Sequence, residues 1–200
     1  MRMNPLILLS LTIIILLVWK TNWFRGFFGE IQVRFLLALL PNKKYTKINN
    51  IILPSGNGST EIDHIILSLN GIFVIETKNR SGWIYGSKNS ANWTQTFENG
   101  RKFQFQNPLR QNYKHTETVI DLLNISEENV HSLVAFSGKA KFKTKLPANV
   151  LTYKQIPSYI KSFHQKVFTQ DQVEEFFNKL EEKRHRGIFA KIQHIWSLRY

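Results

Sequence analysis

The feature that most constrains the fold of this 200-residue chain is a pair of apolar runs flanking Asn70-Gly71, residues 60–69 and 72–78. Asn-Gly between two such runs is typical of a β-hairpin with a two-residue type I′ turn. In that register Leu69 lies opposite Ile72, and alternation of side chains assigns each residue to one of two faces. Both faces are apolar over most of their length, which predicts a central sheet covered on two sides.

The same register predicts a charged group at the open end of the hairpin. Asp63 is expected opposite Lys78 and diagonal to Glu76, with all three side chains on one face. Two carboxylates at this spacing suit a hard cation, and a neighbouring Lys can stabilise negative charge on a phosphate under attack. The alternative is an ordinary cross-strand ion pair between Asp63 and Lys78, with Glu76 in solvent. Charges on a buried sheet are costly unless paired or metal-bound, which favours a functional site.

Further elements follow from periodicity and turn residues along the chain. Asn107-Pro108 pairs an N-cap residue with Pro at the first helical position, so a helix is expected from there to about residue 123. Apart from the hairpin, the expected helices cover residues 27–40, 156–163 and 171–182, and the expected strands cover residues 48–53, 83–86, 93–97 and 131–136.

Three sequence strings resemble the nuclease-related domain family, NERD, a branch of the PD-(D/E)xK nuclease superfamily. They are Glu-Ile-Asp-His-Ile-Ile at 61–66, Gly-Ile-Phe-Val-Ile-Glu-Thr-Lys-Asn at 71–79, and Asn-Pro-Leu-Arg-Gln-Asn at 107–112. The resemblance spans roughly residues 29–136. It implies an α/β fold with a restriction-endonuclease-like core, in which an α-β-β-β-α-β order forms a mixed sheet flanked by helices. It also implies a nuclease that uses Mg²⁺ or Mn²⁺, with Asp63 and Glu76 as metal ligands and Lys78 as the catalytic cation.

The resemblance adds two further site residues. Glu30 of Gly29-Glu30 matches a helix carboxylate of the family, although it also lies four residues before Arg34 and suits an ordinary surface ion pair. Gln111 matches a position near the active face, with a solvated helix face as its alternative. His64 follows Asp63 directly, but strand alternation points it to the opposite face, where a hydrogen-bonded core histidine is expected.

A strongly basic composition indicates a polyanionic partner, because 27 Lys and Arg against 14 Asp and Glu give a net charge of +13. Lysines alternate in one extended segment and would lie on one side, as a phosphate-binding surface; the alternative is a lysine-protected sheet edge or a solvated loop. These lysines are Lys139, Lys141, Lys143 and Lys145. We expect DNA rather than RNA as the nucleic acid, and the basic, aromatic tail at 187–200 suits either DNA or anionic lipid.

The first part of the chain is suited to a membrane. Residues 3–19 carry no charge, and aromatic residues up to position 24 extend the apolar run, so a single membrane-spanning anchor is expected over residues 3–24. A cleaved signal peptide is the alternative, but Val18-Trp19-Lys20-Thr21 offers no small-x-small site. The Lys and Arg residues that follow the run predict a cytoplasmic location for the remainder. They are Lys20, Arg25, Arg34, Lys43 and Lys44.

We therefore expect three segments: a membrane anchor at 1–22, a nuclease-like domain at 23–150 and a basic helical extension at 151–200. The expected function is a membrane-anchored, divalent-metal-dependent nuclease that hydrolyses phosphodiester bonds of DNA. The alternative is a non-catalytic adaptor that binds nucleic acid or anionic membrane on a nuclease-like fold. With no Cys in the sequence, disulfides, thiolate zinc sites and cysteine nucleophiles are excluded.

Overall fold

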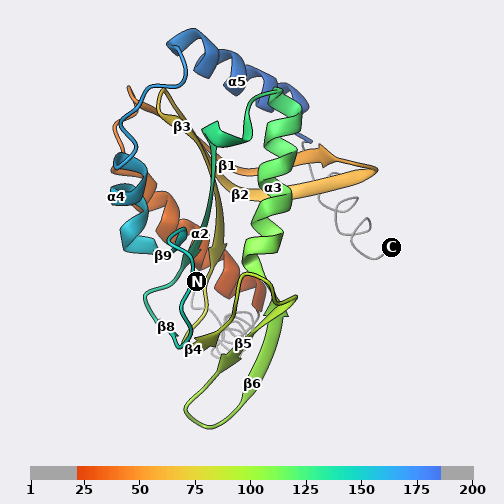
Figure 1. Ribbon diagram of the computed structural model, residues 1–200, viewed down its shortest axis with the longest axis vertical. Coiled ribbons are helices and arrows are strands. Elements are labelled where there is room, and N and C mark those ends of the chain that lie inside the picture. Colours follow the sequence, from red (N-terminus) through yellow and green to blue (C-terminus); the bar gives the residue numbers. More distant parts are fainter. Residues whose placement is uncertain (1–21, 186–200) are drawn as a thin grey trace, which may run out of the picture.

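The computed structural model describes residues 22–185, with side chains from residue 27 onward (Figure 1). Most of the predicted anchor at 3–24 and the whole basic tail at 187–200 therefore lie outside the described residues. Within residues 22–185, no helix is both long enough and apolar enough to cross a membrane.

A mixed five-stranded sheet forms the centre of the molecule, in the order β1-β2-β3-β7-β9. The first three strands form an antiparallel meander, whereas β7 and β9 run parallel to β3. With α2 before the meander and α3 before β7, the predicted α-β-β-β-α-β order is present. The bounds are α2 Asn22–Ala38, β1 Tyr45–Ser55, β2 Gly58–Ser68, β3 Gly71–Lys78, α3 Pro108–Leu123, β7 Val130–Phe136 and β9 Val150–Thr152.

A smaller second sheet, in the order β6-β5-β4-β8, is built mainly from the segment between β3 and α3. It joins the main sheet through aromatic packing, in which the buried Trp93 ring stacks on Phe136 of β7 at 5.9 Å between ring centroids. The strands are β4 Gly82–Tyr85, β5 Asn92–Thr96, β6 Lys102–Gln106 and β8 Ala140–Phe142. Of these, β6 and β8 were not predicted, and neither was β9.

Helices cover both faces of the main sheet, as the alternation of its side chains predicts (Figure 1). Ile65, Leu67 and Val74 pack beneath α3 and α5, whereas Ile66 and Phe73 pack beneath α2 and α4. The remaining bounds are η1 Glu127–Asn129, η2 Tyr153–Gln155, α4 Ile156–Lys161 and α5 Gln170–Lys183. The helix predicted at 156–163 thus ends two residues early.

The predicted type I′ turn at Asn70-Gly71 is wrong. Ser68 pairs with Gly71, so Leu69 and Asn70 form the turn, and Leu67 rather than Leu69 lies opposite Ile72. Two contacts stabilise this register: the Ser68 hydroxyl donates to the Gly71 carbonyl at 2.8 Å, and the Leu69 carbonyl accepts from backbone N–H groups at 167 and 168. Pairing partners change, but the side chains at 65–67 and 72–75 keep their predicted faces because the pairing shifts by two positions. Ile62 is an exception, since it was predicted on the face of Ile66 but packs with Ile65 in the core beneath α3 and α5.

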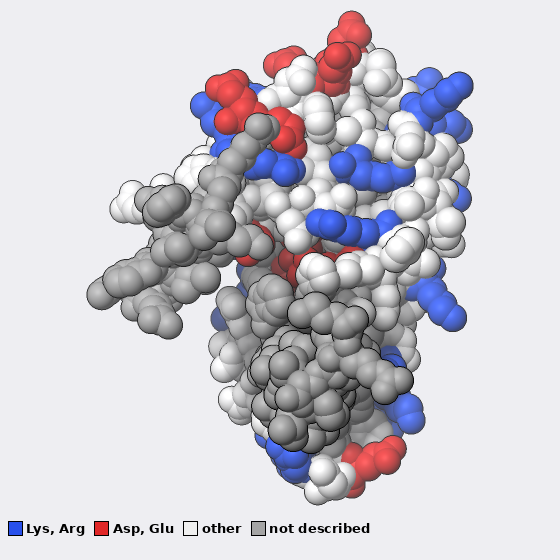
Figure 2. Space-filling model, turned by 180° about the vertical axis from the view of Figure 1, so that it is seen from behind, with Lys and Arg blue, Asp and Glu red and all other residues white. Residues whose placement is uncertain are grey.

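Charge is unevenly distributed over the molecule. On the side shown in Figure 2, Lys and Arg lie over the upper middle and along the right-hand edge, whereas Asp and Glu gather mainly at the top left and bottom. One recessed acidic group lies near the centre of this view.

Candidate functional site

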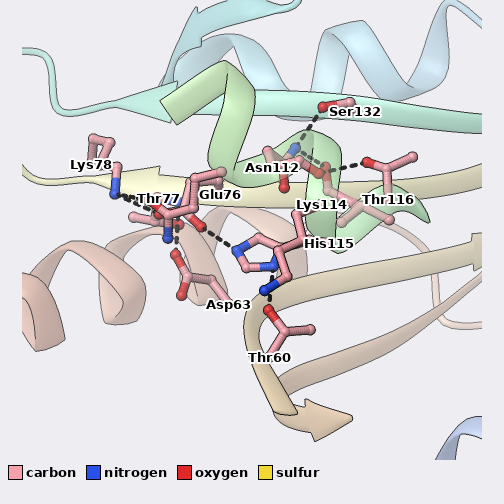
Figure 3. A network of polar contacts seen from close by, with 12 residues as sticks. Thr60, Asp63, Glu76, Thr77, Lys78, Asn112, Lys114, His115, Thr116 and Ser132 are labelled. Atoms are coloured by element: carbon pink, nitrogen blue, oxygen red, sulfur yellow. Dashed lines mark hydrogen bonds and ion pairs between the residues drawn. The ribbon is translucent and has the colours of Figure 1, made fainter. Parts of the chain in front are cut away.

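The corrected register brings two carboxylates together near the middle of the main sheet. The last pair of the β2–β3 register is His64 with Ile75. One position further along, Asp63 lies opposite Glu76, whereas the predicted register made these two residues diagonal neighbours. Asp63 also accepts a hydrogen bond from the Thr77 backbone N–H through Oδ2, at 2.7 Å. Figure 3 shows both carboxylates approaching one another from β2 and β3.

Glu76 is the most enclosed charged group of this site, with 3% of its surface exposed. Its Oε1 lies 2.6 Å from Lys78 Nζ, and its Oε2 lies 3.3 Å from His115 Nε2. The Lys78 ammonium also donates to Gln111 Oε1 at 2.8 Å. The alternative ion pair between Asp63 and Lys78 is therefore wrong, because Lys78 pairs with Glu76.

Helix α3 supplies two polar groups to the site. Gln111 and His115 are four residues apart on its inner side, which excludes the solvated-face alternative for Gln111. His115 is buried, and its Nδ1 lies 2.8 Å from Thr60 Oγ1 of β2, so β2 and α3 fix its ring beside Glu76 (Figure 3). His115 was not predicted as a site residue, although it lies four residues after Gln111 on the same side of the helix.

The pKa values of the two carboxyl groups are shifted in opposite directions. Burial raises the pKa of Asp63 well above its usual range, and the neighbouring Glu76 charge raises this pKa further. Burial also acts to raise the pKa of Glu76, but Lys78 and His115 outweigh it, so the pKa of Glu76 is lowered. Asp63 is thus the carboxyl group that holds a proton most readily, and binding of a cation between the two would release that proton.

Glu30 approaches the site from α2. Its Oε2 accepts a hydrogen bond from Asn50 Nδ2 at 2.9 Å. In the β1–β2 pairing, Asn50 and Asp63 are the two residues left unpaired between the pairs Asn49–His64 and Ile51–Ile62. Asn50 adopts a φ of +49°, which Asn tolerates better than most residues. Burial raises the pKa of Tyr153, as do the charges of Asp63 and Glu30, so these three groups are electrostatic neighbours.

Two other predicted features are placed as follows. His64 is fully buried on the α2 side, with Nδ1 2.7 Å from Asn49 Oδ1, as expected from strand alternation. Its burial, with Arg34 nearby, lowers the pKa of His64 to about 3. The four alternating lysines are all exposed, but the strand there covers only Ala140–Phe142, so the extended segment is shorter than expected.

The donor set suits a hard divalent cation. Asp63 and Glu76 offer carboxylate oxygens, and Glu76 Oε2 is a buried atom that lies 3.3 Å from His115 Nε2. Between residues 22 and 185, no group of three His, Asp or Glu side chains is arranged to hold a metal. Mg²⁺ needs fewer protein ligands, because it usually keeps several waters and binds one or two carboxylates. Asp63 and Glu76 meet that requirement.

Comparison with known proteins gives the family. Residues 25–137 match the nuclease-related domain, NERD. An uncharacterized protein of Bacillus anthracis is 35% identical over 161 residues, which cover 78% of this chain and 75% of that protein. No solved structure matches the chain. The matched segment contains the carboxylate pair, the lysine and the α3 residues of the site, and the chain belongs to the nuclease-related domain family.

Proposed function

We propose that this protein is a metal-dependent nuclease that hydrolyses phosphodiester bonds of DNA. The observation that supports this most directly is the buried Glu76 carboxylate, which lies opposite Asp63 and is held by Lys78 at 2.6 Å. A buried pair of carboxylates beside a cation is costly unless the site has a use for it. Family membership favours the same chemistry.

Each side chain has a role that follows from its contacts. Asp63 and Glu76 would hold Mg²⁺ or Mn²⁺, which when bound supplies charge neutralisation at the phosphate and lowers the pKa of a bound water. The Lys78 ammonium stabilises negative charge that develops on the phosphate oxygens. Gln111 orients that ammonium by accepting from it at 2.8 Å. His115 is a positioning residue that keeps Glu76 turned toward Asp63.

Substrate and membrane contacts complete the proposal. The exposed Lys139, Lys141, Lys143 and Lys145 bind DNA phosphates, consistent with the net charge of +13. Residues 3–24 anchor the protein as a single span, with the nuclease-like domain in the cytoplasm. Glu30, which reaches toward Asp63 from α2, acts as an outer carboxylate of the site.

Purified full chain assayed on labelled single-stranded DNA, double-stranded DNA and RNA tests this function. Cleavage of DNA is expected with Mg²⁺ or Mn²⁺ and none with EDTA. Asp63→Asn and Glu76→Gln should abolish it, because an amide keeps the shape but loses the anionic ligand. Lys78→Ala should slow cleavage by about 10²–10³-fold while metal still binds. Asp121→Asn, on the exposed side of α3, is the matched control and should cleave normally.

Two results would exclude the nuclease proposal: no cleavage by the folded protein with any divalent metal, or undiminished cleavage by the Glu76→Gln variant. DNA binding that needs no metal and falls steeply with salt would then favour the non-catalytic adaptor.

A further inference from the structure

Helix α2 carries large, exposed apolar side chains on its outer side. Its inner side packs Val33 and Leu37 into the core, whereas Phe28, Phe35 and Leu39 are 39%, 70% and 69% exposed. Spacings of seven and four residues align these three side chains in one stripe along the helix and its C-terminal turn. The other large exposed apolar side chains outside α2 in the described part, Tyr85, Phe103 and Tyr113, lie on three separate elements.

A basic pocket lies at the C-terminal end of this stripe. It encloses about 530 Å³ and begins at Pro41, two residues after Leu39. Three exposed lysines and a histidine line it beside aromatic rings, and no Asp or Glu is among the lining residues. The cationic groups are Lys44, Lys161, His164 and Lys166.

We propose that the apolar stripe and the basic pocket together form a membrane-facing surface. Phe28, Phe35 and Leu39 enter the interfacial layer of the bilayer, and the pocket lysines bind the phosphates of anionic lipids. The occupant is a lipid surface because the uncharged run at 3–19 ends three residues before α2 begins at Asn22. This inference rests on the proposed membrane anchor and adds an orientation to it.

A second copy of the chain fits this surface less well. A two-fold symmetric dimer would place the same patch on both partners. Only three apolar side chains make up the stripe, and lysines with no acidic neighbour in the pocket would gather at its end in each copy. An anionic bilayer satisfies both parts of the surface at once.

The proposed orientation leaves the candidate site accessible. Glu76 and Lys78 contact His115 and Gln111 of α3, whereas the stripe lies on the outer side of α2, across the sheet from α3. With α2 against the bilayer, the α3 side of the molecule faces the aqueous phase, where DNA is available.

Single-cysteine labelling tests the surface cleanly, because the natural chain has no Cys. Full-length Phe35→Cys and Leu39→Cys are labelled with an environment-sensitive fluorophore and reconstituted in vesicles of phosphatidylcholine and phosphatidylglycerol. Their emission should shift to the blue and be quenched by lipids that carry a quencher on the acyl chain. Tyr113→Cys on α3, where the native side chain is 56% exposed, is the matched control and should stay unquenched.

The outcomes separate this inference from the anchor and from the nuclease. If the protein binds vesicles but the labels at 35 and 39 are no more quenched than the label at 113, the membrane-facing surface is excluded and the anchor is retained. Protein that does not bind vesicles overturns both. If, in detergent without lipid, the emission of the labels at 35 and 39 shifts to the blue as the protein concentration rises, the stripe binds a second copy of the chain. That result also overturns the proposal.

Charge-reversal variants test the basic pocket in a separate experiment. Lys44→Glu combined with Lys166→Glu should reduce quenching in vesicles with phosphatidylglycerol but not in pure phosphatidylcholine. Unchanged quenching in both vesicles would overturn the role of the pocket. The Glu76→Gln variant should give the parent's quenching, because the surface requires no cleavage activity.

Discussion

At the scale of single residues, Gly29 determines how closely α2 approaches the site. A Cβ at this position would lie 2.6 Å from Tyr153 Oη and 2.8 Å from Asn79 Cβ, closer than real Cβ contacts allow. Only a residue without a side chain lets the helix pass here, and the next residue, Glu30, is thereby held near Asp63. Gly29 and Glu30 thus act together: the glycine lets α2 approach Tyr153 and Asn79 closely, and the carboxylate that follows lies near Asp63.

We expect Gly29→Ala to lower the free energy of unfolding by roughly 1–3 kcal/mol, because overpacking outweighs the gain in helix propensity. Urea denaturation measures the change. Gly138→Ala is the control and should be close to neutral, since no atom lies within 4 Å of a Cβ there. Tyr153→Phe removes the nearest colliding atom and should recover part of the loss. A Gly29→Ala variant as stable as the parent would contradict the close approach.

The sequence indicated which charged residues lie close together better than it indicated how they pair. Glu76 and Lys78 share a face because alternation within β3 depends only on parity, which a two-position shift of the pairing preserves. The partner of Lys78 was wrong because partners depend on the register itself. His115 was overlooked because its contact with Glu76 joins α3 to β3, and spacing within a helix does not reveal such a contact.

At the scale of elements, Asn107 begins α3 and also holds the preceding loop. Its Oδ1 accepts from the Leu109 N–H at 3.0 Å, as expected of an N-cap. Its Nδ2 donates to three backbone carbonyls, those of Ser87, Lys88 and Ser90. The residue is fully buried, and the Ser87 carbonyl also accepts from Trp93 Nε1 at 2.9 Å. The sequence predicted the cap and both ends of the helix, but not the loop contacts.

Asn107→Ala should lower the free energy of unfolding by about 2–4 kcal/mol, as the loss of a cap adds to the loss of the hydrogen bonds that hold the loop. Asn107→Asp separates the two roles, because a carboxylate keeps the cap acceptor but cannot donate to the carbonyls. We expect Asp to be nearly as damaging as Ala in thermal unfolding. An Asp variant of parental stability would assign the whole effect to the cap.

Turns and short strands were the elements least accessible to sequence reasoning. The turn moved to Leu69-Asn70 because Leu69 packs against the core and its carbonyl binds a segment about 100 residues away. Strands β8 and β9 have only three residues each, and their existence depends on partners in β4 and β7. Local pattern carries no information about such partners.

At the scale of the whole molecule, the C-terminal segment belongs to the same cores as the family domain. The family match ends at residue 137, yet Ile156 and Ile160 pack with α2, while Phe176 and Leu180 pack with α3. Strand β9 extends the main sheet itself. Residues 150–183 therefore complete both cores rather than forming an appendage.

Leu180→Ala should destabilise the protein by about 2–5 kcal/mol, since Leu180 is fully buried between α5 and the sheet. Chemical denaturation followed by tryptophan fluorescence and by circular dichroism should give one shared transition at a lower midpoint. Asn178→Ala, exposed on the same helix, should change stability by less than about 0.5 kcal/mol. Two separate transitions would instead make residues 150–183 an independent unit.

The parallel pairing of β3 with β7 has a consequence for the order of folding. The β1–β2–β3 meander closes through short local turns, whereas β7 follows β3 in the chain only after β4, β5, β6 and α3. Non-local pairing of this kind is slow, because a long loop must be closed first. We expect a nascent chain that stops before residue 130 to form the meander but not to dock α3 against β3. Gln111 and His115 of α3 would then reach Glu76 and Lys78 late in folding, when the parallel strands join.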